Sequence, residues 1–219
     1  TLLVHHPACE LHNVPDHPER PARTRVILQA LRARFPTAPP PDPPEALAPL
    51  VSTEQLCLFH DSAHVARIFA LCEKAEAAFS GAGAGGVAAA AGARHRAGPN
   101  TAALAKARAR RALVRIDADT AITPFSREAM LRAAGAACFA VDEVMSGRHA
   151  NAFCCVRPPG HHAEPSTAMG FCFFNSAAVA ALHARRRWGA ERVAVIDFDV
   201  HHGNGTETLF HKLPYAFYA

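Results

Sequence analysis

Two short apolar stretches with a helical pattern between them constrain the fold of this chain more than any other feature. NAFCCV at residues 151–156 and RVAVIDFDV at residues 192–200 have the length and composition of strands. Between them, residues 175–189 predict a helix that ends at Gly189. A strand, a crossover helix and a second strand in this order are typical of parallel α/β packing, with helices on both faces of apolar strands. The sequence therefore predicts an α/β fold with an open parallel sheet flanked by helices.

The remaining segments fit one domain of this kind. Residues 1–6 predict a first strand, the proline-rich residues 35–49 an extended connection, and the glycine- and alanine-rich residues 80–93 a flexible loop followed by a basic helix to about Leu113. Three more helices are predicted from apolar periodicity: one from Pro21 to about residue 35, one from Ser62 to Phe79, and one from an N-cap at Ser126 to just before Gly147. The apolar face of the first should consist of Val26, Ile27, Ala30 and Leu31. Without a repeat or a second domain, residues 1–219 are interpreted as a single domain.

Polar side chains crowd the end of the second apolar stretch. Asp197, Asp199, His201 and His202 follow it directly, and sites in open parallel sheets form beyond the carboxyl ends of the strands. Residues two apart on an extended strand share a face, so Asp199 and His201 are placed to reach one ion, with Asp197 a step deeper. Imidazole with carboxylate suits zinc in a site that stays open to water, although ferrous iron or cobalt would also fit.

A second polar segment, RPPGHHAE at residues 157–164, follows the first apolar stretch. Adjacent residues such as His161 and His162 reach one cavity but hardly ligate one ion together, so acid–base chemistry beside a metal-bound water is the better interpretation. Each signal has a simpler alternative, since an Asp after a strand is often a helix cap and a histidine pair in a loop is often only hydrated. Two such segments after two neighbouring strands are much harder to explain in that way.

Composition narrows the class of protein. The net charge of +4 comes with scattered basic residues, which disfavours nucleic-acid binding, and no apolar run is long enough for a membrane span. The seven cysteines are odd in number and lack C-x-x-C spacing, which is typical of reduced, buried thiols. A cytoplasmic protein is expected, or a nuclear one if the source is eukaryotic. Fourteen histidines stand out, but the first cluster, at residues 5–17, is not assigned a second metal.

The two polar segments also carry a family resemblance. RPPGHHAEPSTAMGFCFFNSAAVAA followed by VAVIDFDVHHGNGTE resembles the zinc-dependent histone deacetylases, on the class II-like side shared with bacterial histone deacetylase-like amidohydrolases and acetylpolyamine amidohydrolases. The likeness extends upstream through HPERP, LFHDSAHV and RIDADTAITPFSREAMLRAAGA, and it is weakest at the proline-rich connection and at residues 80–113. It implies an arginase/deacetylase-like sheet of which this chain holds the N-terminal portion and lacks the C-terminal part.

The resemblance also implies roles for individual residues. Asp199 and His201 match zinc ligands, and His162 matches the general base that later protonates the leaving amine. His161 matches its electrostatic partner, Asp197 the carboxylate behind His161, and Asn204 the group behind His162. Asp197, Asp199 and the backbone at His201 also match part of a potassium site, which makes Zn²⁺, and K⁺ besides it, the expected ions.

For substrate binding, Phe171 after Gly170 matches a wall of the acetyl-lysine channel, Asp119 matches the rim carboxylate that grips the substrate backbone, and Arg20 an arginine of an internal channel. The family needs a further Asp ligand and a transition-state Tyr, which have no match here; Tyr215 and Tyr218 do not stand in a matching context.

Three functions therefore stay open. The first is hydrolysis of acetyl-lysine in a protein or peptide, the second is hydrolysis of an acetylated polyamine or another small amide, and the third is an inactive fragment or a non-catalytic metal-binding partner subunit. Neither a nucleic acid nor a membrane is expected as a partner, and a homo-oligomer is left open.

Overall fold

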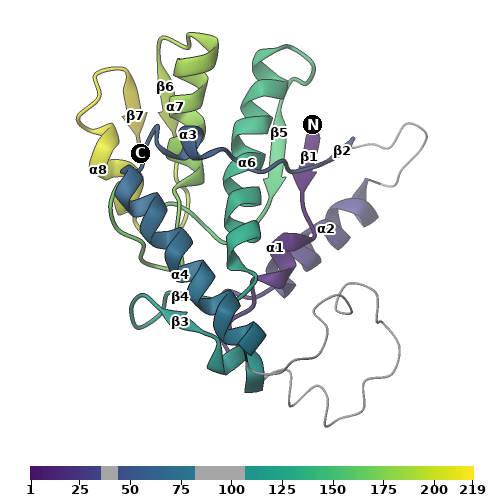
Figure 1. Ribbon diagram of the computed structural model, residues 1–219. Coiled ribbons are helices and arrows are strands. Elements are labelled where there is room, and N and C mark those ends of the chain that lie inside the picture. Colours follow the sequence, from purple (N-terminus) through teal and green to yellow (C-terminus); the bar gives the residue numbers. More distant parts are fainter. Residues whose placement is uncertain (36–43, 82–106) are drawn as a thin grey trace.

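The computed structural model describes residues 1–35, 44–81 and 107–219 (Figure 1). The predicted loop over residues 80–93 and the predicted basic helix after it fall mostly outside the described residues. The strands are β1 (Leu2–His5), β2 (Glu45–Leu47), β3 (Val114–Arg115), β4 (Ala121–Ile122), β5 (Ala152–Cys155), β6 (Val193–Val195) and β7 (Ala216–Tyr218). The helices are α1 (Ala8–Leu11), α2 (Ala22–Arg34), α3 (Thr53–Leu56), α4 (Ser62–Gly81), α6 (Ser126–Met145), α7 (Ser176–Trp188) and α8 (Asn204–Phe210).

The predicted parallel α/β arrangement is confirmed, but the sheet is in separate pieces. Strands β2, β1 and β5 form one parallel sheet in that order, and β6 pairs in parallel with β7. The short hairpin β3–β4 is antiparallel. In the described residues β5 and β6 share no ladder, although α7 connects them as the predicted crossover helix. The inner edges of β5 and β6 therefore face each other without hydrogen bonds between them (Figure 1).

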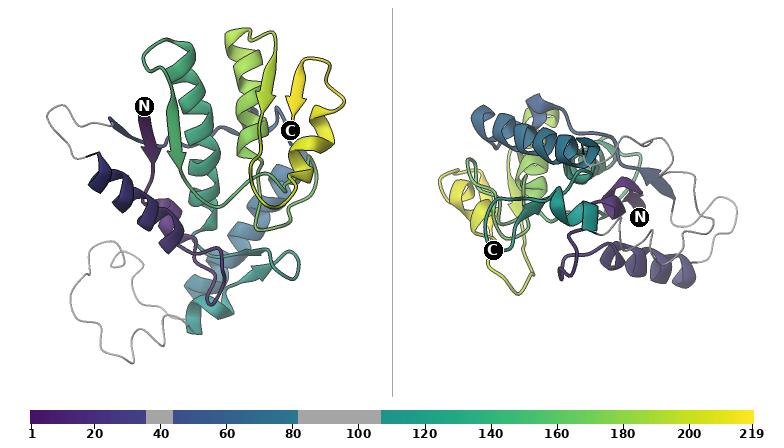
Figure 2. Two further views of the ribbon diagram at one scale, coloured as in Figure 1. Left: turned by 180° about the vertical axis from the view of Figure 1, so that it is seen from behind. Right: turned by 60° about the horizontal axis from the view of Figure 1, so that its bottom comes forward.

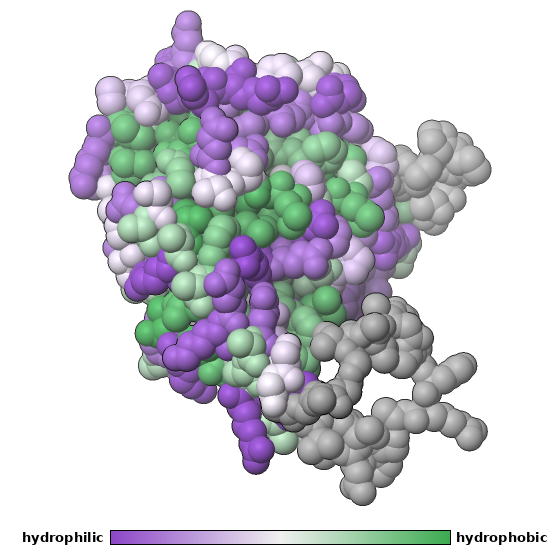
Figure 3. Space-filling view, viewed as in Figure 1, coloured by the Kyte–Doolittle hydropathy of each residue, from purple (hydrophilic) through white to green (hydrophobic). Residues whose placement is uncertain are grey.

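Helices pack on one face of these strands. Helix α6 lies against α7 and β5, and α4 packs beside α6 (Figures 1 and 2). Their small inward residues, such as Ala134 and Ala178, are fully buried and let the helices approach closely. On the helical face shown in Figure 3, apolar surface is interrupted by hydrophilic side chains. This core fixes the loops that follow β5 and β6.

The opposite face of the strands is covered in part, so the expectation of helices on both faces holds for β1 among the described residues: Leu28 of α2 packs there against Leu3 of β1 and Cys155 of β5. Phe153 of β5 is 46% exposed and Phe217 of β7 is 58% exposed. Phe198, just beyond β6, is 97% exposed. The strands are apolar on both faces, as predicted. Among the described residues, helix α2 covers the β1 part of this second face, whereas Phe153 and Phe217 stay exposed (Figure 2).

Several local predictions are corrected by the same packing. Helix α2 contacts the sheet through Leu28 and the partly buried Leu31, so Leu31 of the predicted face is confirmed. The other three residues of that face, Val26, Ile27 and Ala30, are exposed. Ser126 is the first residue of α6 and not its N-cap; its hydroxyl accepts a hydrogen bond from the Thr123 backbone N–H instead.

Other boundaries agree more closely with the sequence. Gly189 ends α7 in the left-handed conformation, as its position predicts. The proline-rich connection contains the short strand β2, whose backbone pairs with β1, and its residues 36–43 lie outside the described ranges. Helix α4 runs two residues further than predicted, to Gly81.

The cysteines agree with the prediction of reduced thiols, since all seven are free. Burial raises the pKa of the Cys72, Cys138 and Cys172 thiols to about 12. Cys57 is the exposed one. Among the described helices, none is long and apolar enough to cross a membrane.

Candidate active site

The loop between β5 and α7 carries the histidine pair, and a buried arginine anchors its start. Arg157 is 2% exposed and donates a hydrogen bond of 2.8 Å to the carboxylate of Glu19, which is also 2% exposed. The same guanidinium donates to the backbone carbonyls of Cys9, at 2.6 Å, and His12. Arg20 was expected to line an internal channel but is exposed, so that prediction is wrong. The loop therefore leaves β5 from a point tied to the N-terminal segment.

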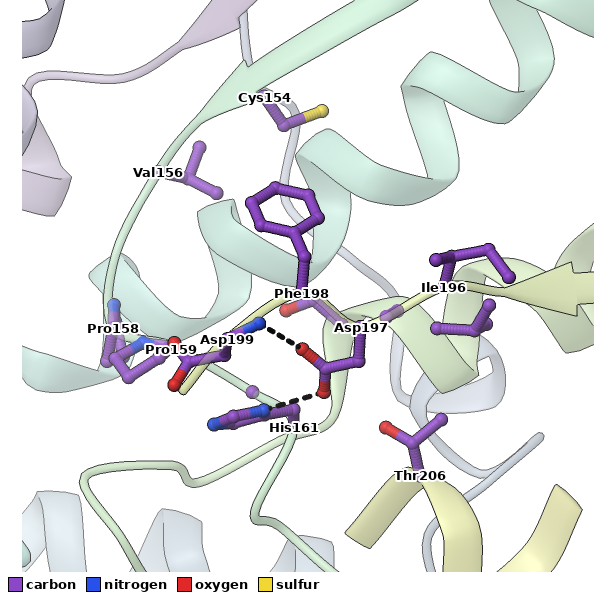
Figure 4. Close-up of a pocket in the computed structure, with 14 residues that line it drawn as sticks. Cys154, Val156, Pro158, Pro159, His161, Ile196, Asp197, Phe198, Asp199 and Thr206 are labelled. Carbon is purple, nitrogen blue, oxygen red and sulfur yellow. Dashed lines mark hydrogen bonds and ion pairs between the residues drawn. The ribbon is translucent and has the colours of Figure 1, made fainter. Parts of the chain in front are cut away.

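His161 pairs with the carboxylate that ends β6. Its Nδ1 lies 2.8 Å from Oδ2 of Asp197, and both side chains are largely buried (Figure 4). The second carboxylate oxygen of Asp197 accepts the backbone N–H of Asp199 at 3.1 Å. A carboxylate at this position fixes the Nδ1–H tautomer and stabilises a positive charge on the ring of His161.

His162 pairs with an amide instead. Its Nδ1 lies 2.8 Å from Oδ1 of Asn204, while Nδ2 of Asn204 donates to the Glu164 carboxylate at 2.9 Å. The contact with Glu164 assigns the amide orientation, so Oδ1 accepts the Nδ1–H of His162. The Nε2 of His162 then carries a lone pair, as a general base requires. Glu164 is a partner that sequence reasoning did not single out, although it stands in the quoted motif.

Gly170 lies directly against the ring of His162. A Cβ at Gly170 would overlap Cδ2 of His162 and come within 2.7 Å of its Cγ, and the backbone φ of Gly170 is +55°. The position therefore needs glycine both for its conformation and for the space that the imidazole occupies.

Asp199 and His201 meet at the end of the same segment. The Nδ1 of His201 lies 3.0 Å from Oδ1 of Asp199, and that oxygen also accepts the backbone N–H of His201 at 2.8 Å. This backbone hydrogen bond is the main reason why the pKa of Asp199 is lowered, and the rings of His201 and His161 contribute. Both side chains are exposed to solvent, 45% for Asp199 and 73% for His201.

This pair fits zinc in donor type but not in number. A hydrolytic zinc site has three protein ligands and one open position, whereas Asp199 and His201 supply two. Over the described residues, no three His, Cys, Asp or Glu side chains are grouped so that they could hold a metal ion. Asp197, expected to contribute to a potassium site, has its carboxylate engaged with His161 and the Asp199 backbone.

Three distant segments meet around Phe171. Its backbone N–H donates to Oγ1 of Thr120 at 3.0 Å, and Thr120 in turn donates to the Asp119 carboxylate at 3.1 Å. The Phe171 ring packs edge-on against His17, with centroids 4.6 Å apart. Phe171 has a φ of +70°, which is uncommon for a side chain of this size. Asp119 is exposed, and Thr120 connects it to Phe171 through these two hydrogen bonds. No sequence pattern indicated this connection.

Two further histidines, His12 and His60, are buried away from the histidine pair. His12 is buried, and burial together with the nearby Arg157 lowers its pKa to about 3. Its Nδ1 lies 2.7 Å from the Ser126 hydroxyl. His60, buried beside α4, has its pKa lowered to about 4 by burial. Both are therefore neutral at pH 7.

Comparison with known proteins decides the family. The model of the histone deacetylase domain matches residues 17–219. This chain belongs to the histone deacetylase family. A probable deacetylase of Methanothermobacter thermautotrophicus is 32% identical over 212 residues, which are 96% of this chain and 50% of that protein. A histone deacetylase-like amidohydrolase of Pseudomonas aeruginosa is 51% identical over 94 residues, 43% of this chain and 25% of that protein.

A solved structure supports the same conclusion for the fold. The crystal structure of the HDA15 HD domain matches with a TM-score of 0.76 and 30% identity, covering all of this chain and 53% of that one. The deacetylase-like α/β fold is thereby confirmed. The chain spans about half the length, or less, of these relatives.

A cavity of about 490 Å³ lies behind the histidine pair of this deacetylase-family chain, between β5 and β6. Cys154 and Val156 line one side, and Phe198 projects toward them from the other (Figure 4). His161, Asp197 and Asp199 also reach it, whereas His162 and Phe171 do not line it. None of the residues that the family resemblance assigns to substrate binding, Asp119, Gly170 and Phe171, lines this cavity.

Proposed function

We propose that this chain carries the histidine side of a zinc-dependent deacetylase site that hydrolyses acetyl-lysine in proteins or peptides. The proposal is supported by the arrangement of two histidines, His161 and His162, beside the metal-type donors Asp199 and His201. His161 has a carboxylate partner and His162 an amide partner, each at 2.8 Å. The ring of His162 lies 6.1 Å from that of His201, and the rings of the pair are 4.1 Å apart.

These partners assign different tasks to the two histidines. His162 holds its proton on Nδ1 toward Asn204, so its Nε2 is free to take a proton from an attacking water and to deliver it to the leaving amine. His161 is backed by Asp197 and stabilises negative charge as it develops on the substrate. Zinc bound through Asp199 and His201 would polarise the acetyl carbonyl and acidify a bound water.

A second candidate function follows from the ligand count and the strand edges. Two protein donors hold zinc less firmly than three, and the edges of β5 and β6 that face each other are unpaired in the described residues. In this candidate the chain is a partner subunit, whose metal site and sheet are completed by another polypeptide that adds strands between β5 and β6.

The two candidates separate in one experiment on the purified chain with zinc supplied. Hydrolysis of a fluorogenic acetyl-lysine peptide is compared for wild type, His162→Ala and His149→Ala, which removes a histidine paired with Glu143 at the far end of α6. The proposal expects His162→Ala to lower kcat about 10²–10⁴-fold while His149→Ala changes nothing. Equal activity of all three would contradict it. Folded wild type without turnover would favour the partner-subunit function, and turnover of acetylspermidine in place of the peptide would reassign the substrate.

A further inference from the structure

The hydroxyl of Tyr218 lies between the two histidine pairs, although sequence reasoning gave this tyrosine no role. It accepts the backbone N–H of Gly203 at 2.9 Å. It also donates toward Oδ2 of Asp197, the oxygen that pairs with His161, over a longer distance of 3.4 Å. Gly203 precedes Asn204, the partner of His162. A single hydroxyl group therefore touches the supports of both histidines.

The backbone holds Tyr218 at this place. Strand β7 pairs with β6 so that Tyr218 stands opposite Val195. Beyond the pair, the N–H of Asp197 donates to the Ala219 carbonyl at 2.7 Å, and the N–H of Ala219 donates to Val195 at 3.2 Å. Both bonds are made by Ala219, the residue after Tyr218, so the end of β7 is held beside Asp197.

Because Gly203 has no side chain, the Tyr218 hydroxyl and the Asp197 carboxylate can both lie close to its backbone. Gly203 is buried, and a Cβ there would overlap Oδ2 of Asp197 and come within 2.7 Å of the Tyr218 hydroxyl. It would also lie 3.2 Å from Nδ1 of His161. Three polar groups thus occupy the space that any other residue would fill, so the arrangement is a packed polar contact and not an incidental approach.

We propose that Tyr218 is a positioning residue of the site, whose hydroxyl holds the Asp197 carboxylate toward His161 and the Gly203 backbone from which Asn204 reaches His162. This inference rests on the proposed function for its catalytic consequence, but not for its geometry. Removing the hydroxyl leaves Gly203 with an unpaired, buried N–H and Asp197 with one restraint fewer. The carboxylate then samples orientations in which its bond to His161 is longer.

The test compares Tyr218→Phe with Tyr215→Phe. Both variants delete one hydroxyl from the same end of the chain, but the ring of Tyr215 packs under the Arg185 guanidinium, 3.5 Å away, and makes no contact with the histidine pairs. The first readout is the NMR signal of the Nδ1 proton of His161, which reports its hydrogen bond to Asp197. We expect this signal to move or broaden in Tyr218→Phe and to stay unchanged in Tyr215→Phe.

Kinetics add a second readout where the preparation turns over acetyl-lysine. Loss of a group that orients a catalytic side chain typically costs about tenfold or more, so Tyr218→Phe should lower kcat about tenfold and leave KM unchanged. An unchanged His161 signal in folded Tyr218→Phe, or equal effects of both variants, would overturn the inference. If wild type has no turnover but the His161 signal still moves in Tyr218→Phe, the positioning role of Tyr218 is supported and only the proposed function is contradicted.

If Tyr218→Phe does not fold, the hydrogen bond between Tyr218 and Gly203 is tested in the wild-type protein. The Gly203 amide hydrogen should exchange slowly with solvent and show a cross-peak to the ring protons of Tyr218. Fast exchange without that cross-peak would overturn the inference.

Discussion

Replacing Gly170 by alanine should destabilise the protein and displace the ring of His162. A second glycine with a positive φ but open space around it serves to measure the backbone strain alone. The φ of Gly170 is +55°, where a side chain costs roughly 1–2 kcal/mol. The new methyl group would also overlap the His162 ring, and overpacking of this kind costs a further ~1–3 kcal/mol. We therefore expect Gly170→Ala to lower the free energy of unfolding by roughly 2–5 kcal/mol and to displace His162.

Gly189→Ala is the matched control. Its φ is +67°, but a Cβ there meets nothing within 4 Å, so only the backbone cost of roughly 1–2 kcal/mol applies. Urea denaturation gives the two free energies, and NMR signals of the His162 ring report its position. If both variants lose the same stability and the His162 signals do not move, the close contact between Gly170 and His162 is refuted.

Three further predictions concern the surroundings of the site. Glu19→Ala leaves the buried Arg157 guanidinium without its carboxylate and should cost ~3–5 kcal/mol in urea denaturation, whereas Glu10→Ala at an exposed ion pair should cost under ~1 kcal/mol; equal costs would refute the assignment of the buried pair. The pKa of His12 is about 3 in the folded protein against an ordinary 6.5, so the unfolded chain binds its proton first. Stability should therefore fall as the pH drops from about 6.5 toward 3, by up to ~1.4 kcal/mol per pH unit, and His12→Gln should flatten this slope; an unchanged slope would contradict it. The exposed Cys57 should react with a thiol reagent in the native protein. The buried thiols of Cys72, Cys138 and Cys172, whose pKa is raised, should react only on unfolding, and fast labelling of any of these three in the native protein would refute the prediction.

The elements that bear the site were predictable because their signals are local. The apolar stretch before Asp197 and the helical pattern before Gly189 depend on residues close in sequence, and the structure contains both elements. Alternation along an extended segment likewise placed Asp199 and His201 together, and the structure has them 3.0 Å apart.

The parts that sequence reasoning missed depend on contacts between distant segments. The Tyr218 hydroxyl reaches Asp197 only because β7 pairs with β6, and Thr120 reaches Phe171 across 51 positions of sequence. The inner stripe of α2 was misplaced for a similar reason. Its periodicity allowed several faces, and the packing partner selected the one with Leu28. Pairing between strands is not encoded in either strand alone, so the separation of β5 from β6 had no local signal.

Zinc binding should depend on the Asp199–His201 pair, because these two side chains are the metal-type donors beside the two histidines. The purified chain is titrated with zinc in competition with a chromophoric chelator, and wild type is compared with His201→Ala and with His202→Ala, whose ring pairs with Glu207 instead. We expect wild type and His202→Ala to bind zinc with equal, weak affinity, because two protein donors hold the ion, and His201→Ala to lose that binding. Zinc binding that survives His201→Ala, or a folded wild type that binds none, would contradict this expectation.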